Sequence, residues 1–158
     1  WPAFSKGILL CISMIGACAG STGGGLKCAR LLILVKSLRR NIRQVINPQR
    51  VQVVRINGSM VSEQTLANTS AFLSAYVIII VASFMLISLD NYSMGTNFSA
   101  VLACVNNIGP GFDSVGPACN YSGFSSFSKL VLCFDMLLGR LEIFPILILF
   151  SRSTWHHK

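Results

Sequence analysis

The stretch of sequence that decides the fold is Gly16-Ala17-Cys18-Ala19-Gly20-Ser21-Thr22-Gly23-Gly24-Gly25-Leu26-Lys27. A second glycine loop, Asn107-Ile108-Gly109-Pro110-Gly111, occurs in the second half of the chain. Each loop follows a short apolar segment and precedes a further hydrophobic one. Glycine permits positive φ and close backbone approach at little cost, and backbone carbonyls that line a pore can replace the hydration shell of an ion. Two such loops in matching context predict an ion-conducting membrane protein.

The composition indicates a membrane protein. The chain has 158 residues, of which 53% are hydrophobic and 11% are charged, whereas soluble domains carry about 25% charged residues. Six basic residues lie in one connecting region without an acid among them: Lys36, Arg39, Arg40, Arg43, Arg50 and Arg55. Between apolar segments, this cluster favours a cytoplasmic loop under the positive-inside rule over a nucleic-acid surface.

The first half reads as an incomplete unit. Phe4–Ile15 is apolar but too short to span a bilayer, which takes about 20 residues, so it suits a re-entrant pore helix. Leu26–Val35 is apolar for about ten residues beside a glycine run, and this predicts a broken inner helix. Asn47-Pro48 ends that helix. Val51–Ile56 then meets Asn57-Gly58, which predicts a small cytoplasmic β-hairpin returning through Ser59–Val61.

The second half reads as one complete unit. Ser70–Leu89 is the clearest spanning helix, and Asp90–Thr96 is a polar turn outside. Asn97–Val105 is the second short apolar helix before its glycine loop. Asp113–Ser128 is rich in Gly, Ser and Asn, which indicates an extracellular connector, and Leu130–Phe150 is the last spanning helix.

We therefore expect an all-α membrane protein built from helix–pore loop–helix repeats of a potassium-channel-like transporter, with a small cytoplasmic β-hairpin. Residues 1–46 would form a partial repeat of pore helix, filter loop and broken inner helix. Residues 47–63 would form a basic cytoplasmic linker with the hairpin. Residues 64–158 would form a repeat of outer helix, pore helix, filter loop and inner helix.

Several other functional classes lack support in the sequence. The glycines before Lys27 fail the phosphate-loop spacing, because Leu26 precedes that lysine and Cys28 replaces Ser/Thr. The six cysteines show no CxxC pair or zinc spacing and read as small apolar residues. Neither an activated nucleophile nor a carboxylate pair is visible, so we expect no enzymatic activity and no covalently bound cofactor.

The candidate ion ligands are main-chain oxygens in the two loops. Pore-helix C-termini carry partial negative charge that favours a cation, and neither loop contains a carboxylate, which favours a dehydrated monovalent ion. The Asn107 side chain would either join the ligands or support the loop from behind. The predicted filter residues are Cys18, Ala19, Gly20, Asn107, Ile108 and Gly109.

Arg140 is the second strong feature. It falls halfway along Leu130–Phe150, where a charge costs at least a few kcal/mol and should face protein or water. Glu142 and Asp135 are misaligned with it on the helix. Arg140 is therefore expected either to face the ion path as a fixed positive charge and gate, or to hold neighbouring helices together.

These motifs resemble a known family. Gly16–Lys27 is similar to the third pore loop of the bacterial Trk-type potassium uptake proteins, of the superfamily that contains Trk, Ktr and HKT transporters. Asn106–Gly111 resembles the fourth pore loop, and Gly139-Arg140-Leu141-Glu142-Ile143-Phe144 resembles the last membrane helix. The resemblance covers essentially the whole chain.

The resemblance implies four repeats around one pore, with Gly20 and Gly109 as filter glycines and potassium as the transported ion. It implies a flexible intramembrane loop within Leu26–Lys36, opposed by Arg140 as the pore arginine. It also implies a multi-pass protein of the cytoplasmic membrane, commonly a homodimer with a peripheral nucleotide-binding regulatory subunit. The basic loop Lys36–Arg55 would then be a docking surface for that subunit.

The chain is accordingly expected to be the C-terminal part of a potassium uptake protein. Two other possibilities remain open. A half-channel could dimerise to bring four loops together, or a structural membrane subunit could use its glycines only for helix packing.

Overall fold

The computed structural model of the chain describes residues 2–16, 24–47, 54–56 and 59–141. The elements in order are α1 (Ala3–Ile15), α2 (Cys28–Ile46), β1 (Arg55–Ile56), β2 (Ser59–Met60), α3 (Glu63–Ile87), η1 (Ser88–Asp90), α4 (Met94–Val105), η2 (Asp113–Val115), η3 (Tyr121–Gly123) and α5 (Ser126–Arg140). Helices dominate, as the sequence predicts.

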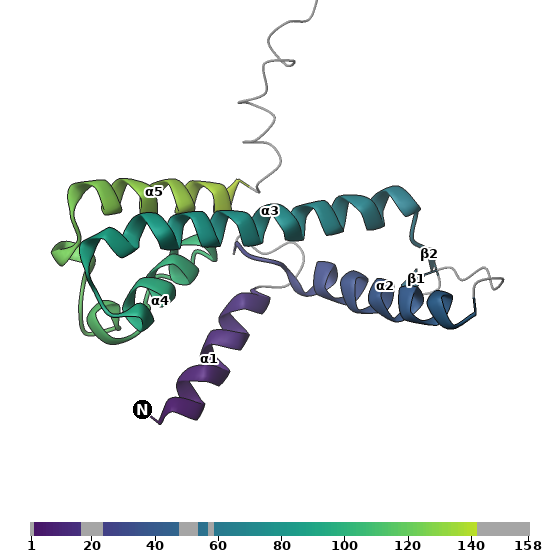
Figure 1. Ribbon diagram of the computed structural model, residues 1–158, viewed down its shortest axis with the longest axis horizontal. Coiled ribbons are helices and arrows are strands. Elements are labelled where there is room, and N and C mark those ends of the chain that lie inside the picture. The colour runs from purple at the N-terminus through teal and green to yellow at the C-terminus, as the bar shows by residue number, and fades with distance from the viewer. Residues whose placement is uncertain (1, 17–23, 48–53, 57–58, 142–158) are drawn as a thin grey trace, which may run out of the picture.

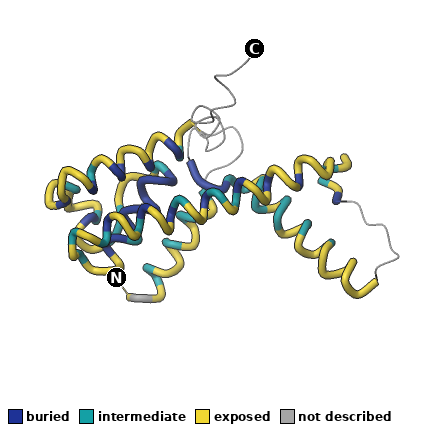
Figure 2. Tube along the Cα trace, turned by 45° about the horizontal axis from the view of Figure 1, so that its top comes forward, coloured by how far each residue is buried: buried dark blue, intermediate teal, exposed yellow. Residues whose placement is uncertain are grey.

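The core lies where α3, α4 and α5 meet. Figure 1 shows α3 and α5 running side by side in opposite directions, with the shorter α4 packed against both. Nine residues of α4 are buried, among them the whole run Ser99–Val105. Figure 2 shows these buried residues gathered at the three-helix core and at the segment just before α2, whereas α1 and the far half of α2 are largely exposed. A short helix is thus enclosed by two longer ones.

Helix α3 is long enough to cross a bilayer. Its 25 residues correspond to about 37 Å at 1.5 Å per residue, against a hydrocarbon core of about 30 Å. Among the described residues it is the one helix that meets the length and hydropathy of a membrane span. Its buried residues recur at three- and four-residue spacing from Leu66 to Ile87, and the opposite face exposes apolar side chains such as Ile78 and Met85.

Serine caps set where three helices begin. The side chains of Ser62, Ser93 and Ser125 each accept a hydrogen bond from a backbone N–H three residues later, at the starts of α3, α4 and α5. Such caps satisfy amide groups that have no partner within the helix. They move the start of α4 from the predicted Asn97 to Met94, and that of α5 from the predicted Leu130 to Ser126.

The prediction of a broken helix over 26–36 is wrong. Helix α2 continues without interruption from Cys28 to Ile46, because leucine, lysine and arginine all favour helix once it has started. The irregular backbone lies before the helix instead, where Lys27 has a φ of 55°. The predicted stop at Asn47 is confirmed.

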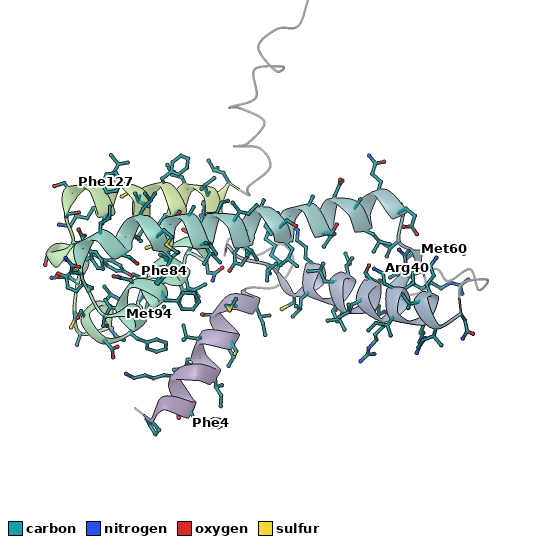
Figure 3. The ribbon with its side chains drawn as sticks, viewed as in Figure 1. Phe4, Arg40, Met60, Phe84, Met94 and Phe127 are labelled. Atoms are coloured by element: carbon teal, nitrogen blue, oxygen red, sulfur yellow. The ribbon has the colours of Figure 1, made fainter. Side chains whose placement is uncertain are left out.

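The predicted β-hairpin is confirmed. Arg55 pairs with Met60 and Ile56 with Ser59 in antiparallel register. Lys36 Nζ donates to the carbonyl oxygen of Arg55 at 2.8 Å, and Arg40 forms an ion pair with Glu63. Figure 3 shows Arg40 projecting from α2 on the side of the hairpin that carries Met60. Two basic side chains of α2 thus hold this helix to the hairpin and to the start of α3.

Candidate functional site at the second glycine loop

The second glycine loop begins at a well-defined helix end. Asn107 has a left-handed φ of 55° directly after α4. Its N–H donates to the carbonyl of Cys104 at 3.1 Å, and the N–H of Ile108 donates to the carbonyl of Ala103 at 2.9 Å. This pair of bonds is a Schellman motif, which satisfies the last carbonyls of a helix and turns the chain. The chain therefore leaves α4 in a fixed direction as it enters the predicted filter residues Asn107, Ile108 and Gly109.

The Asn107 side chain contacts helix α5. Its Nδ2 donates to the carbonyl oxygen of Met136 in α5 at 3.2 Å. Of the two roles that the sequence left open for this amide, the contact favours support from behind. Any ion ligand from Asn107 would then be its main-chain oxygen.

Gly109 has a backbone conformation that other residues rarely adopt. Its φ is +101°, and a Cβ added there would meet nothing within 4 Å. The glycine is therefore required by backbone conformation and not by crowding. The carbonyl oxygen of Gly109 accepts a hydrogen bond of 2.8 Å from the Tyr121 hydroxyl.

That tyrosine belongs to a cluster of three aromatic rings, Tyr92, Tyr121 and Phe124, which we call the aromatic brace. The Tyr121 and Phe124 rings are stacked with centroids 6.0 Å apart, and those of Tyr92 and Phe124 are 4.7 Å apart. Burial raises the pKa of the Tyr121 phenol well above its ordinary value. The hydroxyl therefore keeps its proton across the physiological range and remains a donor to Gly109.

A second support, the glycine junction, consists of Gly24, Gly139 and the end of α4 at Val105 and Asn106. The N–H of Gly24 donates to the carbonyl oxygen of Asn106 at 3.2 Å, which joins the tail of the first loop to the start of the second. A Cβ at Gly24 would lie 2.7 Å from the carbonyl oxygen of Val105, and one at Gly139 would lie still closer to that atom. Only residues without a Cβ permit this packing of three backbone segments.

Asn106 connects the junction to α3. It is 2% exposed, and its Oδ1 accepts a hydrogen bond of 2.9 Å from the Tyr76 hydroxyl. The end of α4 is thereby joined to α3 by Asn106, to α5 by Asn107 and to the first loop by Gly24. The position of the second loop is fixed from three sides.

A cavity of about 570 Å³ lies between α1 and the second glycine loop. Leu10 and Ser13 line it from α1, and Ile108 and Pro110 line it from the loop. At its edge Lys6 Nζ pairs with Asp113 Oδ1 at 2.7 Å, although both side chains are partly exposed. The short helix that precedes the first loop thus faces the second loop across this space.

Of the remaining predicted site residues, only Arg140 is among the described residues. Cys18, Ala19 and Gly20 lie outside the described residues. Arg140 is the last residue of α5 and directly follows Gly139 of the glycine junction. This placement puts Arg140 at the depth where α4 ends and the second loop begins.

Sequence reasoning overlooked the residues that support the loop. Tyr121, Tyr76 and Asn106 are separated along the chain and come together only through packing of α3, α4 and the connector. The available signals were weak: an aromatic residue in a Gly/Ser-rich connector and two consecutive asparagines after an apolar helix. Among the described residues, no three His, Cys, Asp or Glu side chains converge on a metal site.

Comparison with known proteins gives a consistent result. The family model TrkH, described as "Cation transport protein", matches residues 1–157. The Trk system potassium uptake protein TrkH of Escherichia coli K12 is 37% identical over 155 residues, which are 98% of this chain and 32% of the relative. The Trk system potassium uptake protein TrkG of the same organism is 35% identical over 155 residues, with the same coverage.

A solved structure matches as well. The crystal structure of the potassium transporter TrkH from Vibrio parahaemolyticus superposes with a TM-score of 0.88 at 36% identity, over 99% of this chain and 33% of that one. The chain therefore spans about a third of the length of the relatives that it matches.

Proposed function

Because the chain belongs to the TrkH family of cation transport proteins, we propose that it supplies two pore loops of a membrane protein that takes up potassium. The observation that carries this proposal is the second glycine loop, where a Schellman turn leads into Gly109 at a φ of +101°. No charged side chain occurs between Asn107 and Phe112, which leaves main-chain oxygens as the available ligands. Such ligands suit a dehydrated monovalent cation.

The ion ligands would be main-chain oxygens of Cys18, Ala19 and Gly20 in the first loop and of Asn107, Ile108 and Gly109 in the second. Two loops do not close a ring around an ion, so the rest of the pore comes from elsewhere in the protein. By resemblance these would be the third and fourth repeats of four. No chemical transformation of the ion is involved.

We further propose a homodimer in the cytoplasmic membrane that is crossed several times by each chain, with a regulatory subunit on its cytoplasmic side. Arg39 and Arg43 of α2 are exposed, whereas Lys36 and Arg40 are engaged by the hairpin and by Glu63. The two exposed arginines are thus the better candidates for contact with that subunit. Unchanged regulation after both are exchanged for glutamine would contradict this assignment.

Arg140 would gate the pore as a fixed positive charge. At an effective dielectric constant of about 20, a unit charge about 8 Å from a permeating cation opposes it by about 2 kcal/mol. We expect Arg140→Ala to raise rubidium uptake roughly tenfold or more, while Arg140→Lys, which keeps the charge, stays near the parent rate. If Arg140 only held helices together, the alanine variant would lower uptake together with the amount of protein in the membrane.

The aromatic brace would fix the direction of the Gly109 carbonyl. Tyr121→Phe removes only the hydroxyl, and a net hydrogen bond is worth about 1 kcal/mol. We therefore expect a roughly fivefold loss in the preference for rubidium over sodium. Tyr92→Phe is the matched control, because its ring belongs to the same brace while its hydroxyl has no bond to Gly109. Equal selectivity in the two variants would remove Tyr121 from the filter.

The function itself is tested by rubidium uptake with the full-length gene product in cells that lack their own potassium uptake. Uptake that persists when sodium is present in excess is the expected result. Absence of uptake in cells that hold normal amounts of the protein in their membranes would favour a structural subunit whose glycines serve helix packing.

A further inference from the structure

Asp135 is a carboxyl group buried between α3 and α5. It is 1% exposed. Its Oδ1 accepts a hydrogen bond of 2.7 Å from the Ser83 hydroxyl of α3, and its Oδ2 is buried without a hydrogen-bond partner among the described residues. A carboxylate in this position would have one hydroxyl donor for its negative charge.

The groups around Asp135 supply no positive charge. Within the described residues, no lysine or arginine forms an ion pair with Asp135, whereas Lys6 pairs with Asp113 and Arg40 with Glu63. Helix α3 offers the Ser83 hydroxyl, and α4 offers the Cys104 thiol. A charged carboxylate that has lost its water and gained no cation is strongly disfavoured against the neutral acid.

We infer that Asp135 is a proton-binding site behind the pore helix α4, occupied in the resting protein and emptied at alkaline pH. On emptying, the O–H bond of the carboxyl breaks, its electron pair stays on the carboxylate and the proton passes to water. Ser83 lies four residues before the end of α3 at Ile87. Asp135 lies nine residues after the start of α5 at Ser126 and five before its end at Arg140, so the site is inside the helix bundle.

A hydrogen bond directly beside this site joins it to the second glycine loop. Asp135 immediately precedes Met136, whose carbonyl oxygen accepts the hydrogen bond of 3.2 Å from Asn107 Nδ2. A negative charge on Asp135 would draw water into this part of α5, and a shift of Met136 would disturb the hydrogen bond that supports the loop.

The occupied site has a direct spectroscopic signature that does not depend on transport. In the purified full-length protein at neutral pH, the infrared difference between parent and Asp135→Asn should contain the carbonyl band of a protonated carboxylic acid. Ser83→Ala should keep that band and shift it to higher frequency, because Oδ1 loses its hydrogen bond. A carboxylate band in its place would overturn the inference. Asp135→Leu, which is apolar and of similar volume, gives the same difference spectrum if the asparagine variant does not fold.

The consequence for uptake rests on the proposed function. Rubidium uptake by the parent should fall several-fold between mildly acidic and alkaline external pH. Asp135→Asn mimics the protonated acid, so its uptake should equal that of the parent at low pH and change little as the pH is raised. An identical fall in both proteins would overturn the link to the loop. If neither protein takes up rubidium, the proposed function fails while the infrared result still decides the proton site.

Discussion

Gly139→Ala is expected to destabilise the protein more than any other single methyl addition in the described core. The new Cβ would overlap the carbonyl oxygen of Val105 and lie 2.7 Å from Asn107 Nδ2 and 2.9 Å from the carbonyl carbon of Val105. Two of these atoms belong to backbone, so no side-chain rotation relieves the clash, and α5 has to move away from α4. Overpacking costs typically about 1–3 kcal/mol, and we expect about 3 kcal/mol here, with loss of the Asn107–Met136 hydrogen bond.

The melting temperature of the detergent-solubilised full-length protein and the amount found in membranes measure this effect. Gly7→Ala in α1 is the matched control, because a Cβ there meets nothing within 4 Å. Alanine is favoured over glycine within helices by roughly 0.5–1 kcal/mol, so this variant should be as stable as the parent or slightly more so. Equal melting temperatures for Gly139→Ala and the parent would show that α4 and α5 are not packed through this glycine.

Gly109→Ser is expected to abolish most of the discrimination between potassium and sodium. Since the space around a Cβ at this position is open, the effect comes from the backbone, whose φ of +101° suits only glycine. Forcing a residue with a side chain into such a conformation costs about 1–3 kcal/mol. The loop should relax to a more common φ and rotate the carbonyl away from Tyr121, with a roughly tenfold or greater fall in rubidium preference.

Rubidium uptake with and without competing sodium, at equal membrane levels, measures this change. Gly7→Ser is the control for the residue exchange, because Gly7 lies in the regular helix α1. If Gly109→Ser lowers the protein level but leaves ion preference intact, the glycine serves assembly and the second loop is not a filter. A preference changed equally by both variants would also contradict the assignment.

Much of the helical framework could be predicted from apolar patterning. The short segments Phe4–Ile15 and Asn97–Val105 correspond to α1 and α4 within three residues, and the long segment Ser70–Leu89 corresponds to α3, which begins seven residues earlier at Glu63. Apolar patterning predicts helix starts too late where a serine cap precedes a polar first turn, because the pattern begins at the first apolar residue. The break expected within 26–36 is wrong because the glycine run lies before the helix, and the change from apolar to basic residues does not end it.

The candidate site was less predictable because its supports are tertiary. The glycine loops are visible in sequence, since glycine at fixed positions reports backbone conformation. By contrast, Tyr121 reaches Gly109 across a connector, and Ser83 reaches Asp135 over a separation of 52 residues. In the sequence Asp135 is only a misaligned neighbour of Arg140, since nothing in a single helix reveals which buried partner faces a carboxyl group.

The enclosure of α4 also bears on how the protein is made. Its 12 residues are too few to cross the bilayer alone, and the two helices that bury it come from before and after it in the chain. When α4 leaves the ribosome, α1 and α3 have already been synthesised, but the surface of α4 that α5 covers stays exposed until α5 follows. The burial of α4 is therefore completed late, when α5 packs against it, and a chain released after truncation before Ser126 should leave Cys104, which is buried in the folded protein, open to water-soluble thiol reagents.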